Sequence, residues 1–72
     1  MSVENVIAAE VYMDLRRGDP IKDGELAIAI SVFEDMVETT VLMGQRFDLF
    51  TVELNSTLNT LIGFRDFRRK DK

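Results

Sequence analysis

The stretch that decides the fold is Phe47–Arg69, which reads FDLFTVELNSTLNTLIGFRDFRR. Its apolar residues recur at steps of three or four and, at about 100° per residue, fall on one face of a helix. This stripe consists of Phe47, Phe50, Leu54, Leu58, Leu61 and Phe64. A helix of this length needs other segments to keep its stripe out of water. The sequence therefore predicts a helix over about 47–69 that packs against the rest of the chain.

The first segment of the chain has the same periodicity and predicts a helix over about 3–17. Ser2 is well placed as its N-cap, and Gly18 as the left-handed residue that follows its end. The helix has two apolar stripes rather than one, which are Ile7, Val11 and Leu15 on one side and Val6, Ala9 and Met13 on the other. One stripe can serve the core of this chain, so the second either has a different partner or is simply exposed, as single apolar residues often are.

The second helix is predicted over about 24–43, with Asp23 as its N-cap and Gly44 at its end. An alternative start places Asp19 at the cap and Pro20 in the first helical position. Its apolar side chains cover about half of its circumference, which is more than one neighbouring helix needs. They are Leu26, Ala29, Ile30, Val32, Phe33, Met36, Val37, Val41 and Met43. This width suits a helix packed against two others, or against one helix and a subunit interface.

Together these patterns predict an all-α fold in one domain, residues 1–72, with three helices. The link between the second and third helices is short, so the two form an antiparallel hairpin. In a chain of this size, one hydrophobic core contributes only about 3–5 kcal/mol to the free energy of unfolding. The chain has no Cys and no His, so disulfides and the usual zinc sites cannot supplement that core. We therefore expect the helices to assemble into a homo-oligomeric bundle.

The charge of −4 is divided unevenly along the chain. Residues 1–44 carry nine acidic and three basic side chains, whereas residues 45–72 carry four acidic and six basic ones. An acidic chain with one basic end is a poor general nucleic-acid binder, although it suits binding to a second copy of itself. There is no apolar run long enough to span a membrane and no secretory signal pattern at the start, so a cytoplasmic location is expected.

Glu34, Asp35 and Glu38 form an acidic cluster, E-D-x-x-E, on the second helix. Carboxylates at this spacing share a helix face and can hold Mg²⁺ or Mn²⁺ through oxygen. All-helical nucleotide pyrophosphohydrolases use two such pairs, but here no second pair follows, because Glu53 precedes Ser56 by three positions. A solvated acidic face is the favoured interpretation, and a metal-dependent nucleotide hydrolase is kept as the second alternative. No cofactor is predicted.

A set of polar and basic residues suggests a small-ligand site: Arg46, Asn55, Asn59, Arg65 and Arg68. Asn55 and Asn59 are neighbours on one flank of a helix and can read the hydrogen-bonding edge of a ligand. The arginines, together with the last basic residues of the chain, suit phosphate binding or simply the end of a helix dipole. This set supports an alternative function, a nucleotide-sequestering protein whose site lies between subunits.

The run RRGDPIKDGEL, residues 16–26, followed by the segment RFDLFTVEL, residues 46–54, resembles short all-helical accessory proteins encoded by bacteriophages. Some of these proteins bind a host protein, and others sequester a signalling nucleotide in an oligomer. The resemblance implies a regulator or inhibitor, and it assigns no binding residue because no motif aligns residue by residue.

The sequence thus favours a small protein that acts by binding and not as an enzyme. With neither Cys nor His, its serines lack the usual catalytic base. The expected mechanism is occlusion, in which surplus apolar helix faces dock onto a second copy or a host protein. The predicted interaction surface is Val6, Ala9 and Met13 on the first helix with Leu49, Val52 and Phe67 on the third.

Overall fold

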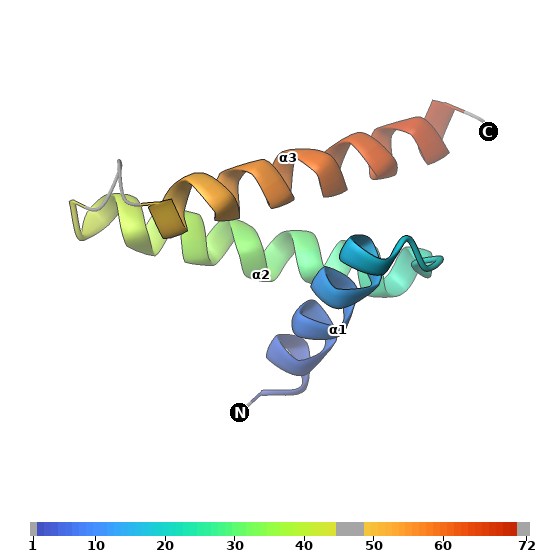
Figure 1. The fold of residues 1–72 in the computed structure, drawn as a ribbon, viewed down its shortest axis with the longest axis horizontal. Coiled ribbons are helices and arrows are strands. Elements are labelled where there is room, and N and C mark those ends of the chain that lie inside the picture. The colour runs from blue at the N-terminus through green and yellow to red at the C-terminus, as the bar shows by residue number, and fades with distance from the viewer. Residues whose placement is uncertain (1, 45–48, 71–72) are drawn as a thin grey trace.

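The computed structural model describes residues 2–44 and 49–70, and these residues form three helices and no strands. Helix α1 spans Val3–Arg17, α2 spans Asp23–Leu42 and α3 spans Leu49–Lys70 (Figure 1). The all-α prediction and the order of its helices are confirmed, whereas the predicted start of the third helix at residue 47 lies outside the described residues. Within the described ranges, no helix is both long and apolar enough to cross a lipid bilayer.

Both ends of α1 follow the sequence signals. The hydroxyl oxygen of Ser2 accepts a hydrogen bond from the backbone N–H of Asn5 at 3.2 Å, which satisfies one of the unpaired donors of the first turn. At the other end Gly18 has φ of +77°. The N–H of Asp19 then donates to the carbonyl oxygen of Asp14 at 2.9 Å, the long bond of a Schellman motif.

The start of α2 differs from its prediction. The helix begins at Asp23, and the cap position is occupied by Lys22, which has an extended backbone and no capping hydrogen bond from its side chain. An ammonium group has no acceptor for a backbone N–H, and the Asp23 carboxylate instead accepts a hydrogen bond from Arg68 of α3 at 2.6 Å. The alternative start is also wrong, because Asp19 and Pro20 both lie in the connector before the helix.

Helix α2 is the central element of the fold. It packs against α1 on one side and against α3 on another, whereas α1 and α3 have few contacts with each other. Helices α2 and α3 run antiparallel side by side, and α1 crosses them at a steep angle (Figure 1). Two neighbours within the same chain therefore cover most of the wide apolar surface of α2, but not Met36 and Met43.

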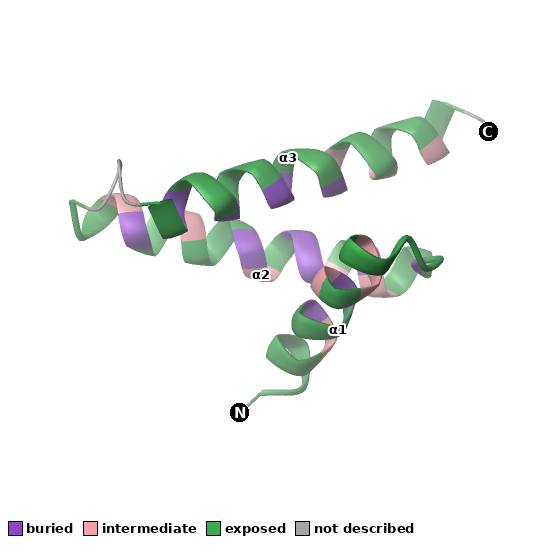
Figure 2. Ribbon diagram, in the orientation of Figure 1, coloured by how far each residue is buried: buried purple, intermediate pink, exposed green. Residues whose placement is uncertain are grey.

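The core lies where the three helices meet (Figure 2). Its buried apolar residues are Ala8, Val11, Ile21, Leu26, Ala29, Ile30, Phe33, Leu54, Leu58 and Leu61. Three threonines are buried with them, at positions 40, 51 and 57. The hydroxyl of Thr40 donates to the carbonyl oxygen of Val37 in the same helix at 2.8 Å. Because this hydrogen bond satisfies the hydroxyl donor, the threonine side chain can be buried among apolar residues.

The ends of the predicted stripes are not covered. On α3 the exposed fractions are 53% for Phe50 and 41% for Phe64, and on α2 they are 37% for Met36 and 66% for Met43. The prediction that the other segments cover the whole α3 stripe is therefore wrong at Phe50 and Phe64, and Phe47 lies outside the described residues. The reason is geometrical, because α1 crosses the hairpin near its middle and covers only part of its length (Figure 1).

Candidate interaction surfaces

A groove of about 1060 Å³ runs between α1 and the α2–α3 hairpin. It exists because α1 diverges from the hairpin toward its own N-terminus (Figure 1). Phe33 and Leu54, which are buried, form part of its lining together with half-buried Val32. A smaller hollow of about 500 Å³ adjoins it and shares Asn5, Val32, Met36 and Phe50 with it.

Apolar side chains from all three helices line the groove. Three of the residues predicted as an interaction surface, Val6, Ala9 and Met13, contribute the α1 wall, and Val6 and Met13 are 44% and 49% exposed. Met36 from α2 and Phe50 from α3 face them across the groove. Phe50, which the sequence predicts to be covered within the chain, is therefore part of this surface.

The charged residues that line the groove are Glu10, Arg17 and Glu53. Arg17 is paired with Asp14 at 3.3 Å and with Asp19 at 3.4 Å. Glu10, by contrast, makes no ion pair with any residue that the structure describes. The groove therefore combines an apolar lining with an available acidic group at its edge.

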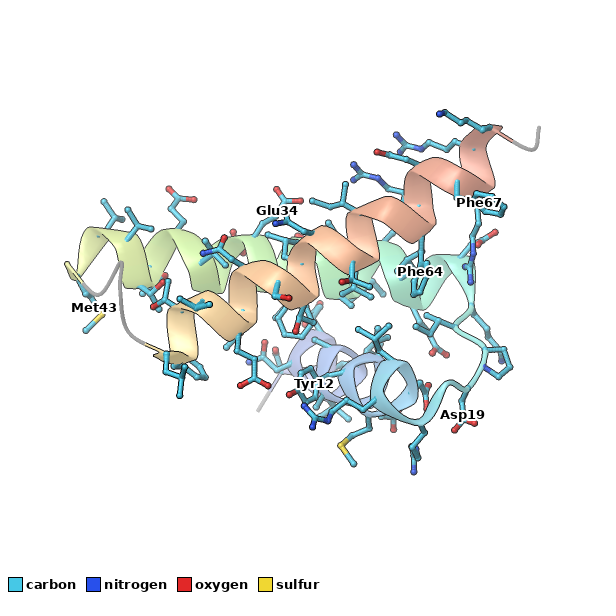
Figure 3. All side chains as sticks on the ribbon, turned by 45° about the horizontal axis from the view of Figure 1, so that its top comes forward. Tyr12, Asp19, Glu34, Met43, Phe64 and Phe67 are labelled. Carbon is cyan, nitrogen blue, oxygen red and sulfur yellow. The ribbon has the colours of Figure 1, made fainter. Side chains whose placement is uncertain are left out.

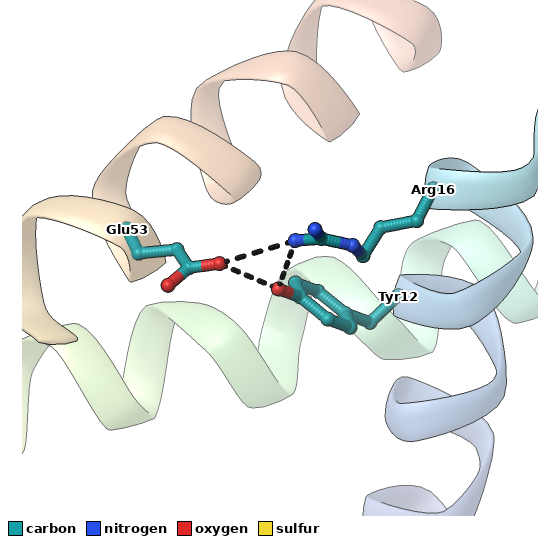
Figure 4. Close-up of polar contacts among 3 residues, drawn as sticks. All are labelled: Tyr12, Arg16 and Glu53. Atoms are coloured by element: carbon teal, nitrogen blue, oxygen red, sulfur yellow. Dashed lines mark hydrogen bonds and ion pairs between the residues drawn. The ribbon is translucent and has the colours of Figure 1, made fainter.

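A polar contact joins α1 to α3 beside the groove (Figure 4). The Tyr12 hydroxyl donates to the Glu53 carboxylate at 2.6 Å, and Arg16 donates to the Tyr12 hydroxyl at 2.9 Å. Arg16 also lies 3.4 Å from the same carboxylate oxygen of Glu53, and its guanidinium carbon is 5.6 Å from the centre of the Tyr12 ring. Sequence reasoning missed this contact, since only the four-residue spacing of Tyr12 and Arg16 is visible locally.

The other half of the predicted interaction surface lies on α3, away from the groove lining. Leu49, Val52 and Phe67 are 81%, 54% and 67% exposed, and Figure 3 shows Phe67 on the last turns of the helix. The structure therefore divides the predicted surface into two parts, the groove side of α1 and the outward side of α3.

The residues predicted to bind a small ligand are not brought together within one chain. Asn55 donates to the carbonyl oxygen of Thr51 in its own helix at 3.2 Å, and Asn59 is exposed. Arg68 is paired with Asp23 of α2. At 1.5 Å per residue, Arg68 lies about 20 Å farther along α3 than Asn55.

Arg65 lies near its neighbour Asp66, with 3.5 Å between its Nε and a carboxylate oxygen, and this Nε is buried without a hydrogen bond. Arg46 lies outside the described residues. The geometry of one chain therefore gives no specific support to the nucleotide-sequestering alternative.

The acidic cluster on α2 shows no ligand geometry. Glu34, Asp35 and Glu38 are all exposed, and Glu34 projects from the side of α2 away from α1 (Figure 3). Among the described residues, no three side chains of the His, Cys, Asp or Glu type come together in a way that could hold a metal ion.

Comparison of the chain with models of known protein families, with curated proteins and with solved structures finds no match in any of the three. What the protein does is therefore argued from its own surfaces.

Proposed function

We propose that this is a small helical interaction protein that binds an amphipathic helix of another protein in the groove, and that it acts by occlusion rather than by catalysis. The observation that carries the proposal is the convergence of partly exposed apolar side chains from all three helices: Val6, Met13, Met36 and Phe50. Burying such side chains on a partner is favourable by about 25 cal/mol per Å². The resemblance to phage accessory proteins implies that the partner is a host protein.

The dimensions and charge of the groove suit a helix. The groove has a volume of about 1060 Å³ and is lined by side chains of all three helices, so it is large enough to receive the apolar side chains of one helix face. Docking the apolar face of a helix into such a groove is a common mode of peptide recognition. Because Glu10 is available at the edge, a helix with basic residues beside its apolar face is favoured over an acidic one.

A direct test uses two model peptides of about 14 residues, one built from Leu and Lys and the other from Leu and Glu. The Leu–Lys peptide is expected to shift the methyl NMR signals of Val6, Ala9 and Met13 and to bind at least tenfold more tightly than the Leu–Glu peptide. Met13→Glu should weaken this binding, whereas Val3→Glu, an exposed position outside the groove lining, should not. Equal binding of both peptides, or shifts spread over the whole surface, would count against the proposal.

The partner itself can be sought by photocrosslinking. A photoreactive phenylalanine analogue at Ala9, inside the groove, is expected to give a discrete adduct with one protein in a host lysate. The same analogue at Ala27, which is exposed on α2 and outside the groove lining, is the matched control. The same adducts from both positions would show non-specific capture.

A further inference from the structure

The outward side of α3 has a stripe with apolar ends and a small, polar middle. It lies opposite the buried side of the helix, and all of its members are exposed. Its residues are Leu49, Val52, Ser56, Thr60, Gly63 and Phe67. Their spacing of three or four residues places them in one row along the helix. The stripe is thus a second helix-packing surface that none of the described residues of this chain covers.

The stripe is nearly symmetrical about the level of Leu58. Leu49 and Phe67 lie nine residues before and after it, and Ser56 and Thr60 lie two residues before and after it. An antiparallel second copy would therefore place its Phe67 opposite Leu49 and its Thr60 opposite Ser56. A two-fold interface requires this kind of self-complementary pattern, because the same surface is used on both subunits.

Gly63 gives an independent reason to expect a close neighbour. A glycine inside a helix is less favourable than alanine, yet a Cβ at Gly63 would meet nothing within 4 Å. Packing within the chain therefore does not explain the glycine. In the antiparallel pairing Gly63 of each copy lies beside Val52 of the other, where a missing Cβ lets the two helices approach.

The distribution of charge favours the antiparallel arrangement over the parallel one. Arg69 and Lys70 are exposed at the end of α3, while Glu34, Asp35 and Glu38 are exposed on the half of α2 that packs beside the start of α3. Asp23, at the start of α2, is paired with Arg68, and Arg69 and Lys70 are the other basic side chains in the last turn of α3. An antiparallel second copy brings Arg69 and Lys70 of each α3 to the end of the other hairpin where Glu34, Asp35 and Glu38 lie. A parallel copy would place like charges together, which is unfavourable.

We propose that two copies of this protein pair through the outward faces of α3, antiparallel and related by a two-fold axis at the level of Leu58. The occupant of the stripe is thus a second copy of this chain. This dimer is independent of the groove, which stays open on both subunits. One pair of helices makes an interface at the small end of the usual range, so dissociation in the micromolar range is expected.

The first measurement is the mass of the protein by sedimentation equilibrium over a range of concentrations. A rise from 8.2 kDa toward twice that value is expected. Phe67→Asp and Gly63→Leu should each weaken dimerisation roughly tenfold or more while the helical circular dichroism of the monomer is kept. Val3→Asp changes an equally exposed apolar side chain elsewhere and should leave dimerisation unchanged. A monomer at every concentration, or a Gly63→Leu variant that dimerises as well as the parent, would overturn the proposal.

Orientation is tested by disulfide crosslinking, since the chain has no cysteine of its own. Leu49→Cys and Phe67→Cys proteins are mixed and oxidised. Antiparallel pairing predicts that the mixed dimer, linked from position 49 to position 67, forms at least tenfold faster than either homodimer. Predominant links from 49 to 49 and from 67 to 67 would show a parallel pair and contradict the antiparallel arrangement.

Discussion

At the scale of single residues, Gly18 fixes the turn that lets α1 cross the hairpin. Its φ of +77° is accessible to glycine and strained for other residues, and its N–H donates to the carbonyl oxygen of Leu15 at 3.4 Å. A Cβ at this position would meet no atom within 4 Å, so the requirement for glycine comes from the backbone and not from crowding.

Gly18→Ala is expected to lower the free energy of unfolding by about 1–2 kcal/mol, because alanine would be held in the left-handed region. Urea denaturation followed by circular dichroism measures the change. Gly24→Ala is the matched control, since Gly24 is inside a helix with open space around it and alanine there should be neutral or stabilising. An equal loss of stability in both variants would contradict the explanation based on the positive φ of Gly18.

Leu61 is the largest side chain that is completely buried. Leu61→Ala is expected to cost about 2–5 kcal/mol, which approaches the whole stability of a domain this small. Leu42→Ala, at a position that is 80% exposed, should change stability by less than about 0.5 kcal/mol. Thermal and urea denaturation of the two variants provide the comparison. A Leu61→Ala protein as stable as the parent would show that Leu61 is not part of the core.

At the scale of helices, the angle of α1 is set by apolar packing more than by its polar contacts. Ala8 and Val11 are buried against the hairpin. The Arg16 and Glu53 side chains are 63% and 55% exposed, so their ion pair is largely screened by water.

Tyr12→Phe should therefore lower the free energy of unfolding by less than about 1 kcal/mol, although it removes both hydrogen bonds of the Tyr12 hydroxyl. Val11→Ala, which shortens a side chain with no exposed surface, should cost more. Urea titrations of both variants test the order of the two effects, and the reverse order would show that the polar contact holds α1 in place.

The helices themselves could be predicted from the sequence because their signals are local. Ser2 and Gly18 act on the turns beside them, and the period of the leucines at 54, 58 and 61 identifies the buried side of α3. The surfaces could be predicted only in part. Whether Phe50 is covered depends on where α1 crosses the hairpin, and the Tyr12–Glu53 hydrogen bond joins residues 41 positions apart. Neither property leaves a periodic signal in the sequence.

At the scale of the whole molecule, stability and association are expected to be linked. A small core leaves few kcal/mol of stability, and any partner that binds only the folded state adds to it by mass action. The proposed dimer should therefore make the melting temperature depend on protein concentration.

Over a hundredfold range of concentration that spans the dissociation constant, the melting temperature is expected to rise by several degrees. Differential scanning calorimetry measures it. Phe67→Asp should abolish the dependence, whereas Val3→Asp, at a site that is 72% exposed on α1, should retain it. A melting temperature that stays constant in the parent protein would argue against an association linked to folding.

The first turn of α1 has a consequence for the range of partners. Residues 3–6 are exposed, and the first buried residue of the helix is Ala8. The first turn of α1 therefore contributes no buried side chain to the core. On the other side of the groove, Leu54, Leu58 and Leu61 of α3 are buried in the core that it shares with α2. In the proposed complex, a helix with bulky side chains would therefore displace this first turn more readily than the α2–α3 hairpin, because fewer buried contacts hold the turn in place.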